Sequence, residues 1–130
     1  MNFDFQRTLR LFNDAPNPHI IKIFFYILIH QPLDGSRGFK INKQQLQFDL
    51  KLSRTNFFTS MHWLKDNLFI QELKMLEESD FMVNPFIVMN NGDRDERIAE
   101  WNRRCNLDSA RESRLRKERR RREAKKANQQ

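Results

Sequence analysis

The chain has 130 residues, of which 38% are hydrophobic and 32% charged, and its formal net charge at pH 7 is +7. This length allows one domain with a modest hydrophobic core. The most apolar segment, residues 20–29, is too short to span a bilayer and contains Lys22, so no membrane association is expected. The single cysteine, Cys105, has no partner for a disulfide within the chain, and no secretory signal is expected from the first residues.

The positive charge is concentrated near the C-terminus. Residues 103–130 contain 12 of the 24 Lys and Arg but 4 of the 17 Asp and Glu, which gives +8, so residues 1–102 carry −1. A block of like charge is typical of a tail that binds nucleic acid or an acidic surface. Residues 108–130 are either a lone charged helix or an arm that orders on nucleic acid. The basic residues of this tail are Arg111, Arg114, Arg116, Lys117, Arg119, Arg120, Arg121, Arg122, Lys125 and Lys126.

Residues 1–16 form an N-terminal segment whose apolar spacing fits a strand or a helix, with a preference for a helix. Asn17-Pro18 is a typical helix start, because Asn can cap free N–H groups and Pro fits the first helical position. The helix that follows should run to about Gln31. It is apolar on nearly all sides, which predicts a central, buried helix.

The next segment predicts a short strand and two helices. Phe39-Lys40-Ile41 is typical of a strand, Asn42 should cap a helix from Lys43 to about Leu50, and Ser53 should cap a second helix that ends near Asn67. Four apolar residues of this second helix recur at helical spacing and should face the core. They are Phe57, Met61, Leu64 and Leu68.

The other face of this second helix carries short polar side chains and an arginine, which suit base edges and phosphate oxygens. Arg54 and Asn56 are predicted to read base edges, because Arg pairs with guanine and Asn with adenine in bidentate geometry. Backbone contacts are expected from Thr55, Thr59, Ser60, His62, Lys65 and Lys43. Phe58 and Trp63 also lie off the core face. They are expected to fill an interface with a neighbouring helix, with DNA contact as the alternative.

A β-hairpin is predicted next. From Phe69 the pattern alternates as in a strand, Glu77-Glu78-Ser79-Asp80 is typical of a turn, and a second strand should cover residues 81–89. Pro85 cannot donate to a ladder, so pairing near it should be one-sided or bulged. The acidic turn argues against close phosphate contact by the hairpin tip.

Residues 93–107 should form a C-terminal helix whose first turn is acidic, which complements the helix dipole. Ile98, Trp101 and Cys105 make a narrow apolar stripe along it. This stripe could pack on the body of the protein, or on a second copy to form a homodimer through Ile98 and Trp101.

The predicted order of elements is helix, short strand, two helices and a hairpin, which is the order of a winged helix–turn–helix. The fold class is therefore mainly α with a small β-hairpin. We expect a winged helix–turn–helix domain over residues 17–92 and a C-terminal basic helical extension.

Three stretches carry a family resemblance: LSRTNFFTSMHWLKDNLFI from Leu52, FMVNPFIVM from Phe81, and the step Gly92-Asp93. Together they make residues 52–101 similar to the winged-helix replication initiators of small plasmids, the RepL type. The resemblance implies a role in plasmid or phage replication. The acidic hairpin tip and the arginine-rich tail depart from that pattern, so the family's wing contacts are not carried over.

The sequence therefore predicts a protein that binds duplex DNA at specific sequences, in the cytoplasm and associated with the nucleoid or a plasmid. Two alternatives are a transcriptional regulator of the same fold and an adaptor whose tail binds RNA or an acidic protein. An enzyme is not expected, because the three glycines form no phosphate-binding loop. No metal or other cofactor is expected, because one Cys and three scattered His make no zinc site.

Overall fold

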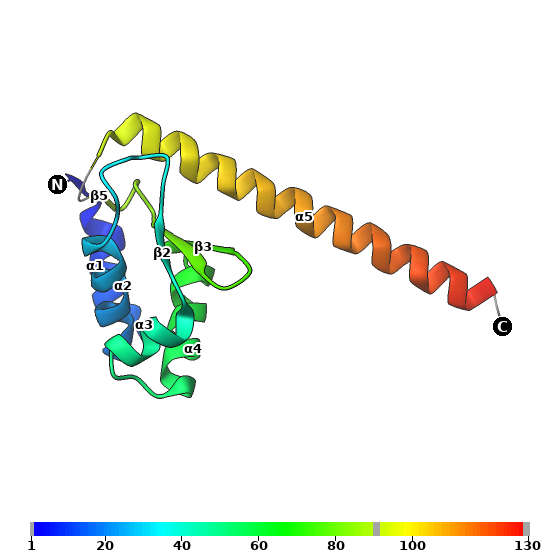
Figure 1. Cartoon of the computed structure of the whole chain (residues 1–130), viewed down its shortest axis with the longest axis horizontal. Coiled ribbons are helices and arrows are strands. Elements are labelled where there is room, and N and C mark those ends of the chain that lie inside the picture. Colours follow the sequence, from blue (N-terminus) through cyan, green and yellow to red (C-terminus); the bar gives the residue numbers. More distant parts are fainter. Residues whose placement is uncertain (1, 90–91, 129–130) are drawn as a thin grey trace.

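A computed structural model describes residues 2–89 and 92–128 of the chain (Figure 1). This part of the protein is mainly helical and contains a three-stranded antiparallel sheet, which agrees with the predicted class at this level. None of the helices described is both long enough and apolar enough to cross a bilayer. The elements in chain order are β1 (Asn2–Phe3), α1 (Phe5–Asp14), α2 (His19–Ile29), β2 (Phe39–Ile41), α3 (Lys43–Asp49), α4 (Arg54–Asp66), β3 (Ile70–Lys74), β4 (Ser79–Val83), β5 (Val88–Met89) and α5 (Arg94–Asn128).

Side-chain caps begin the first two helices. Asp4 Oδ1 accepts hydrogen bonds from two backbone N–H groups at the start of α1, so the helix preferred for the N-terminal segment is present. Asn17 Oδ1 accepts a hydrogen bond from the backbone N–H of His19 at 3.0 Å, as expected of a cap, but α2 begins at His19, so Pro18 precedes the helix instead of occupying its first position. α2 is the central helix of the core. Its buried residues are Ile20, Ile23, Phe24, Ile27 and Leu28.

α3 and α4 are joined by a tight turn. Asn42 and Ser53 accept hydrogen bonds from backbone N–H groups of the helices that follow them, at 2.8 and 3.2 Å, which confirms both predicted caps. Lys51 in the turn has a φ of 55°. Leu50 and Leu52 on either side of it are buried and attach the turn to the core.

α4 presents one apolar face to α2. Three of the four residues predicted for this face are buried: Phe57, Met61 and Leu64. The prediction for Leu68 is wrong, because α4 ends at Asp66 and the chain then turns. Leu68 has a φ of 58° and is 56% exposed, and Phe69 enters the core in its place.

The three-stranded sheet has the order β2-β4-β3, and α2, α4 and α5 cover its two faces. Side chains alternate between the faces of a strand. Phe81 and Val83 of β4 join the main core with α2 and α4. Asp80 and Gln71 point to the other face, where both contact α5. The sheet therefore lies between the helices of the main core and the N-terminal part of α5.

The β3–β4 turn begins earlier than predicted. Ser79 and Asp80 were expected in the turn, but they are the first residues of β4, and both are buried. Only residues 75–78 connect the two strands. The prediction failed because small polar and acidic residues are typical of turns, whereas the partners that bury these two side chains lie elsewhere in the sequence.

The second strand of the predicted hairpin stops at Asn84-Pro85. β4 ends at Val83, and the Asn84 carbonyl accepts a hydrogen bond from the N–H of Ile87 at 3.0 Å, which turns the chain. The next strand, β5, pairs with β1, with Val88 opposite Phe3. Pro85 therefore lies outside the ladder rather than in one-sided or bulged pairing.

α5 is one helix of 35 residues, so the predicted C-terminal helix and the basic tail form a single element. Figure 1 shows its N-terminal part beside the sheet and the remainder projecting away from the rest of the protein. At about 1.5 Å per residue its length is roughly 50 Å. Beyond Cys105, every residue whose exposure is described is exposed.

The apolar stripe of α5 packs on its own chain. Trp101 is 4% exposed, and its carbonyl accepts a hydrogen bond from Gln71 Nε2 at 3.0 Å. The same nitrogen lies 2.8 Å from Cys105 Sγ. Of the two predicted partners of this stripe, the structure shows the body of the protein. A homodimer through Ile98 and Trp101 would require this packing to open.

Candidate nucleic-acid interface

The outer face of α4 carries most of the side chains predicted to contact DNA. The middle of this face, opposite the buried residues, is formed by Thr55, Thr59, His62 and, at the end of the helix, Asp66, and all four are exposed. Arg54 and Asn56 are also exposed. No other part of the described chain covers this surface, so a ligand can approach α4 along its whole length.

Ser60 does not belong to this face, and its predicted phosphate contact is therefore wrong. Its side chain is fully buried, and its hydroxyl donates a hydrogen bond to Asn17 Oδ1 at 3.2 Å. Ser60 lies three residues after Phe57, and residues with this spacing share a face of a helix. The hydroxyl therefore joins the start of α2 to α4 inside the protein.

Arg54 and Asn56 lie on opposite flanks of the outer face. Residues two positions apart in a helix are separated by about 200° around its axis. Asn56 Nδ2 lies 3.5 Å from His19 Nε2, on the flank beside the start of α2. The Arg54 guanidinium lies 5.7 Å from the ring centre of Phe58, on the other flank. The two predicted base readers thus bracket the threonines and His62 rather than standing side by side.

Phe58 and Trp63 have different surroundings. Trp63 is half-buried, and its ring stacks on Phe69 with 5.5 Å between centroids and 14° between planes. Trp63 therefore packs inward, but the ring that it stacks on belongs to the segment between α4 and β3 and not to a neighbouring helix as expected. Phe58 is 45% exposed, and Lys43 Nζ lies 5.9 Å from its ring centre on the flank shared with Arg54. Phe58 is thus an exposed apolar ring close to two cations.

Lys43 and Lys65, both predicted to contact the DNA backbone, share a buried carboxylate. Their Nζ atoms lie 2.8 and 2.9 Å from the two side-chain oxygens of Glu72 in β3. The side chain of Glu72 is 2% exposed. The Ser79 hydroxyl donates a third hydrogen bond to Glu72, at 2.5 Å. Burial raises the pKa of Glu72, but the hydrogen bonds from Lys43, Ser79 and Lys65 outweigh it and lower this pKa to about 2. Glu72 is therefore ionised near neutral pH and offsets one of the two lysine charges.

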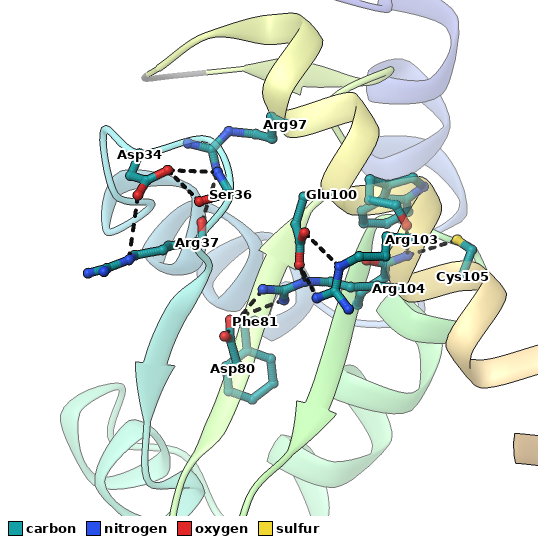
Figure 2. Close-up of polar contacts among 12 residues, drawn as sticks. Asp34, Ser36, Arg37, Asp80, Phe81, Arg97, Glu100, Arg103, Arg104 and Cys105 are labelled. Atoms are coloured by element: carbon teal, nitrogen blue, oxygen red, sulfur yellow. Dashed lines mark hydrogen bonds and ion pairs between the residues drawn. The ribbon is translucent and has the colours of Figure 1, made fainter.

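A buried ion-pair network attaches α5 to the sheet (Figure 2). The two terminal nitrogens of Arg104 lie 3.1 and 3.2 Å from the two carboxylate oxygens of Asp80. Its Nε donates to Glu100 at 3.0 Å. Arg104 is 2% exposed. A Cβ atom on Gly38 would collide with the Asp80 carboxylate and lie 2.6 Å from the Phe81 carbonyl, so the network requires glycine there.

A second arginine attaches the start of α5. Arg97 is buried and donates hydrogen bonds to the Pro32 carbonyl at 2.6 Å and to Gln31 Oε1 at 3.1 Å. Sequence reasoning missed Arg97 and Arg104 because they belong to a stretch rich in charge. Their spacing contained a signal: Arg97, Trp101 and Arg104 are four and three residues apart and so share one face of a helix.

The exposed part of α5 is basic around its whole circumference. The ten basic residues predicted for the tail are all exposed. Four of them, Arg119–Arg122, are consecutive, and at about 100° per residue they point to all sides of the helix. Among the residues described, no group of three or more His, Cys, Asp or Glu is placed to hold a metal ion.

No protein-family model, curated protein or solved structure matches this chain.

Proposed function

We propose that this chain is a winged helix–turn–helix protein that binds duplex DNA at specific sequences. In this proposal α3 and α4 are the helix pair, α4 enters the major groove, and the β3–β4 hairpin is the wing. The observation that carries the proposal is the uncovered outer face of α4, where hydrogen-bonding side chains are exposed together. They are Arg54, Thr55, Asn56, Thr59 and His62.

The chemistry of this face suits the edges of base pairs. The major groove is wide enough for a helix and displays a distinct set of donors and acceptors for each base pair. Thr55, Thr59 and His62, in the middle of the face, reach its floor first. Arg54 on one flank can pair with guanine, and Asn56 on the other with adenine.

In this proposal, α4 supplies the sequence specificity and another part of the chain supplies most of the affinity for phosphates. Residues 1–102 carry −1, and Glu72 offsets one of the two lysines near α4. The four residues of the β3–β4 turn, Met75, Leu76, Glu77 and Glu78, are exposed and include no cation for phosphates, although the exposed Lys74 directly precedes them. The sequence-independent attraction to phosphates is therefore assigned to the exposed basic part of α5.

The resemblance of residues 52–101 to RepL-type initiators favours the initiation or control of plasmid or phage replication. Transcriptional regulation is the alternative that the same fold supports. A replicon that depends on this chain distinguishes replication initiation from transcriptional regulation. Arg54→Ala should lower copy number if the chain initiates replication, and should raise transcription from the bound promoter if it represses.

Selection of bound sequences from a random duplex pool tests the proposal directly. One sequence should be enriched, and Arg54→Ala and Asn56→Ala should each weaken binding to it by about 1–3 kcal/mol with little effect on random DNA. Arg7→Ala, an exposed arginine on α1, is the matched control and should bind both DNAs as the wild type does. Equal losses on both DNAs would exclude base reading, and a pool without enrichment would remove the proposal.

The circumference of cations on α5 supports a second candidate, RNA binding. Arginine-rich segments bind structured RNA, and a helix that is basic on all sides can meet RNA phosphates in any rotational setting. Competition between duplex DNA and structured RNA for the full chain separates the candidates. Retention of a protein partner by α5 after nuclease treatment would instead favour an adaptor that binds an acidic protein.

A further inference from the structure

Phe58 is the exception on the outer face of α4. Its neighbours on that face are polar or charged, yet its ring is 45% exposed. The ring makes an edge-on contact with buried Phe57, with 5.5 Å between centroids. Lys43 Nζ and the Arg54 guanidinium lie 5.9 and 5.7 Å from the ring centre of Phe58. An exposed apolar surface therefore lies beside two cations, of which Lys43 is also paired with Glu72.

This combination matches one feature of the major groove. Base edges there present hydrogen-bond donors and acceptors and one apolar group, the 5-methyl of thymine. Phosphates lie along both sides of the groove, where flanking cations are favourable. An exposed apolar ring beside these cations therefore fits a thymine methyl, with Arg54 reaching the edge of a neighbouring base and Lys43 lying nearer the groove wall.

We propose that Phe58 contacts the 5-methyl group of a thymine and so selects an A·T pair within the bound site. This inference rests on the proposed function and adds a base preference to it. Phe58 lies one helical turn after Arg54, which is about 6 Å along α4. Base pairs rise by about 3.4 Å, so the selected thymine lies within about two base pairs of the position that Arg54 reads.

Deoxyuridine differs from thymidine only by the missing methyl, so it tests this contact atom by atom. After selection of the preferred site, each thymine is replaced in turn by deoxyuridine, and the affinity of the full chain is measured. One replacement should weaken binding about fourfold, the value for one buried methyl-sized group. Phe58→Ala should bind the thymine and deoxyuridine sites equally, while Phe58→Leu should still prefer thymine.

Phe48 provides the matched control. It is an exposed phenylalanine on α3, outside α4, and is 77% exposed. Phe48→Ala should keep the wild-type response to deoxyuridine. Thermal unfolding and far-UV circular dichroism check that each variant is folded.

The outcomes separate this inference from the proposed function. Specific binding that no deoxyuridine weakens, or a Phe58→Ala variant that keeps the wild-type loss, would overturn the methyl contact and leave DNA recognition standing. A random pool without any enriched sequence would remove both. Reduced binding by Phe58→Ala to thymine and deoxyuridine sites alike, with the wild type indifferent to the methyl, would indicate a wedge between base pairs instead.

Discussion

Glu72 lies at the meeting point of β3, α3 and α4. Its carboxylate accepts hydrogen bonds from Lys43 at the start of α3, from Lys65 near the end of α4, and from Ser79 on the neighbouring strand. A carboxylate with few partners would be costly at this degree of burial. Three donors from three elements make it instead a fixed point that sets the position of α4 relative to the hairpin.

The stability of the protein should depend on Glu72 in a defined pH range. Its folded-state pKa of about 2 lies below the unfolded value of about 4.3. The carboxylate therefore stabilises the fold fully above about pH 5, and this contribution is lost as the pH falls toward 2. Glu72→Gln should lower the free energy of unfolding by on the order of 2–3 kcal/mol at pH 7 and much less at pH 2.

Urea unfolding between pH 2 and pH 7 measures this dependence. Glu77→Gln is the control, because Glu77 is exposed in the β3–β4 turn and should change stability little at any pH. Parallel stability profiles for the wild type and Glu72→Gln would show that Glu72 is not held in its ionised form by these donors.

The docking of α5 depends on the ion pair between Asp80 and Arg104. Removing one member of a buried pair leaves the other uncompensated, which costs about 3–5 kcal/mol. Asp80→Ala and Arg104→Ala should therefore each destabilise the protein by about 3 kcal/mol. The double variant should lose at least 1 kcal/mol less than the sum of the single losses, roughly the coupling expected between residues in contact.

Denaturant unfolding followed by tryptophan fluorescence tests this coupling, because Trp101 lies on the docked face of α5. Arg103→Ala is the control. Its partner is the same Glu100, but the Arg103 side chain is 56% exposed, so its loss should cost about 1 kcal/mol or less. Strictly additive losses for Asp80 and Arg104 would mean that the pair does not attach α5.

The elements that sequence reasoning predicted well depend on local signals. Asn17, Asn42 and Ser53 each satisfy N–H groups within three residues, and the core face of α4 follows from helical spacing. The failures depend on distant partners. Asp80 was assigned to a turn because its partner, Arg104, is 24 residues away and no local pattern indicates the pairing. Ser60 was assigned to the surface for the same reason, since its partner, Asn17, is 43 residues away.

The candidate interface was predictable in composition but not in arrangement. The sequence indicates that polar residues share the outer face of α4, and it identifies the basic residues of the tail. It does not show that Glu72 pairs with Lys43 and Lys65, or that Trp63 packs inward while Phe58 stays exposed. These details follow from contacts between α4, α3 and the sheet, which helical spacing alone does not determine.

At the scale of the whole molecule, the basic charge and the proposed recognition surface are separated. The basic part of α5 projects from the body, while the outer face of α4 belongs to the near-neutral part of the chain (Figure 1). Replacing Arg119–Arg122 by Gln in the full chain should therefore reduce the dependence of DNA affinity on salt without changing the preferred sequence. If all four arginines meet phosphates, the log–log slope should become shallower by roughly 3–4.

Titration of binding at several salt concentrations measures that slope. Arg54→Ala offers the comparison, because it removes one charge and should change the slope by about 1 or less. A slope unaffected by the four replacements would mean that α5 does not meet the phosphates of the bound duplex.

The unbroken course of α5 has a consequence for how such an arm tolerates change. One extra residue between its docked and free parts would turn every later side chain by about 100° and advance it by about 1.5 Å. Because arginines occupy every side, the rotated arm would present much the same positive ring. A proline at that point would instead bend the arm toward a new direction. The charge that the arm presents thus depends little on rotation about the helix axis. It depends strongly on the direction of the axis, which the ion pair between Asp80 and Arg104 fixes relative to the sheet.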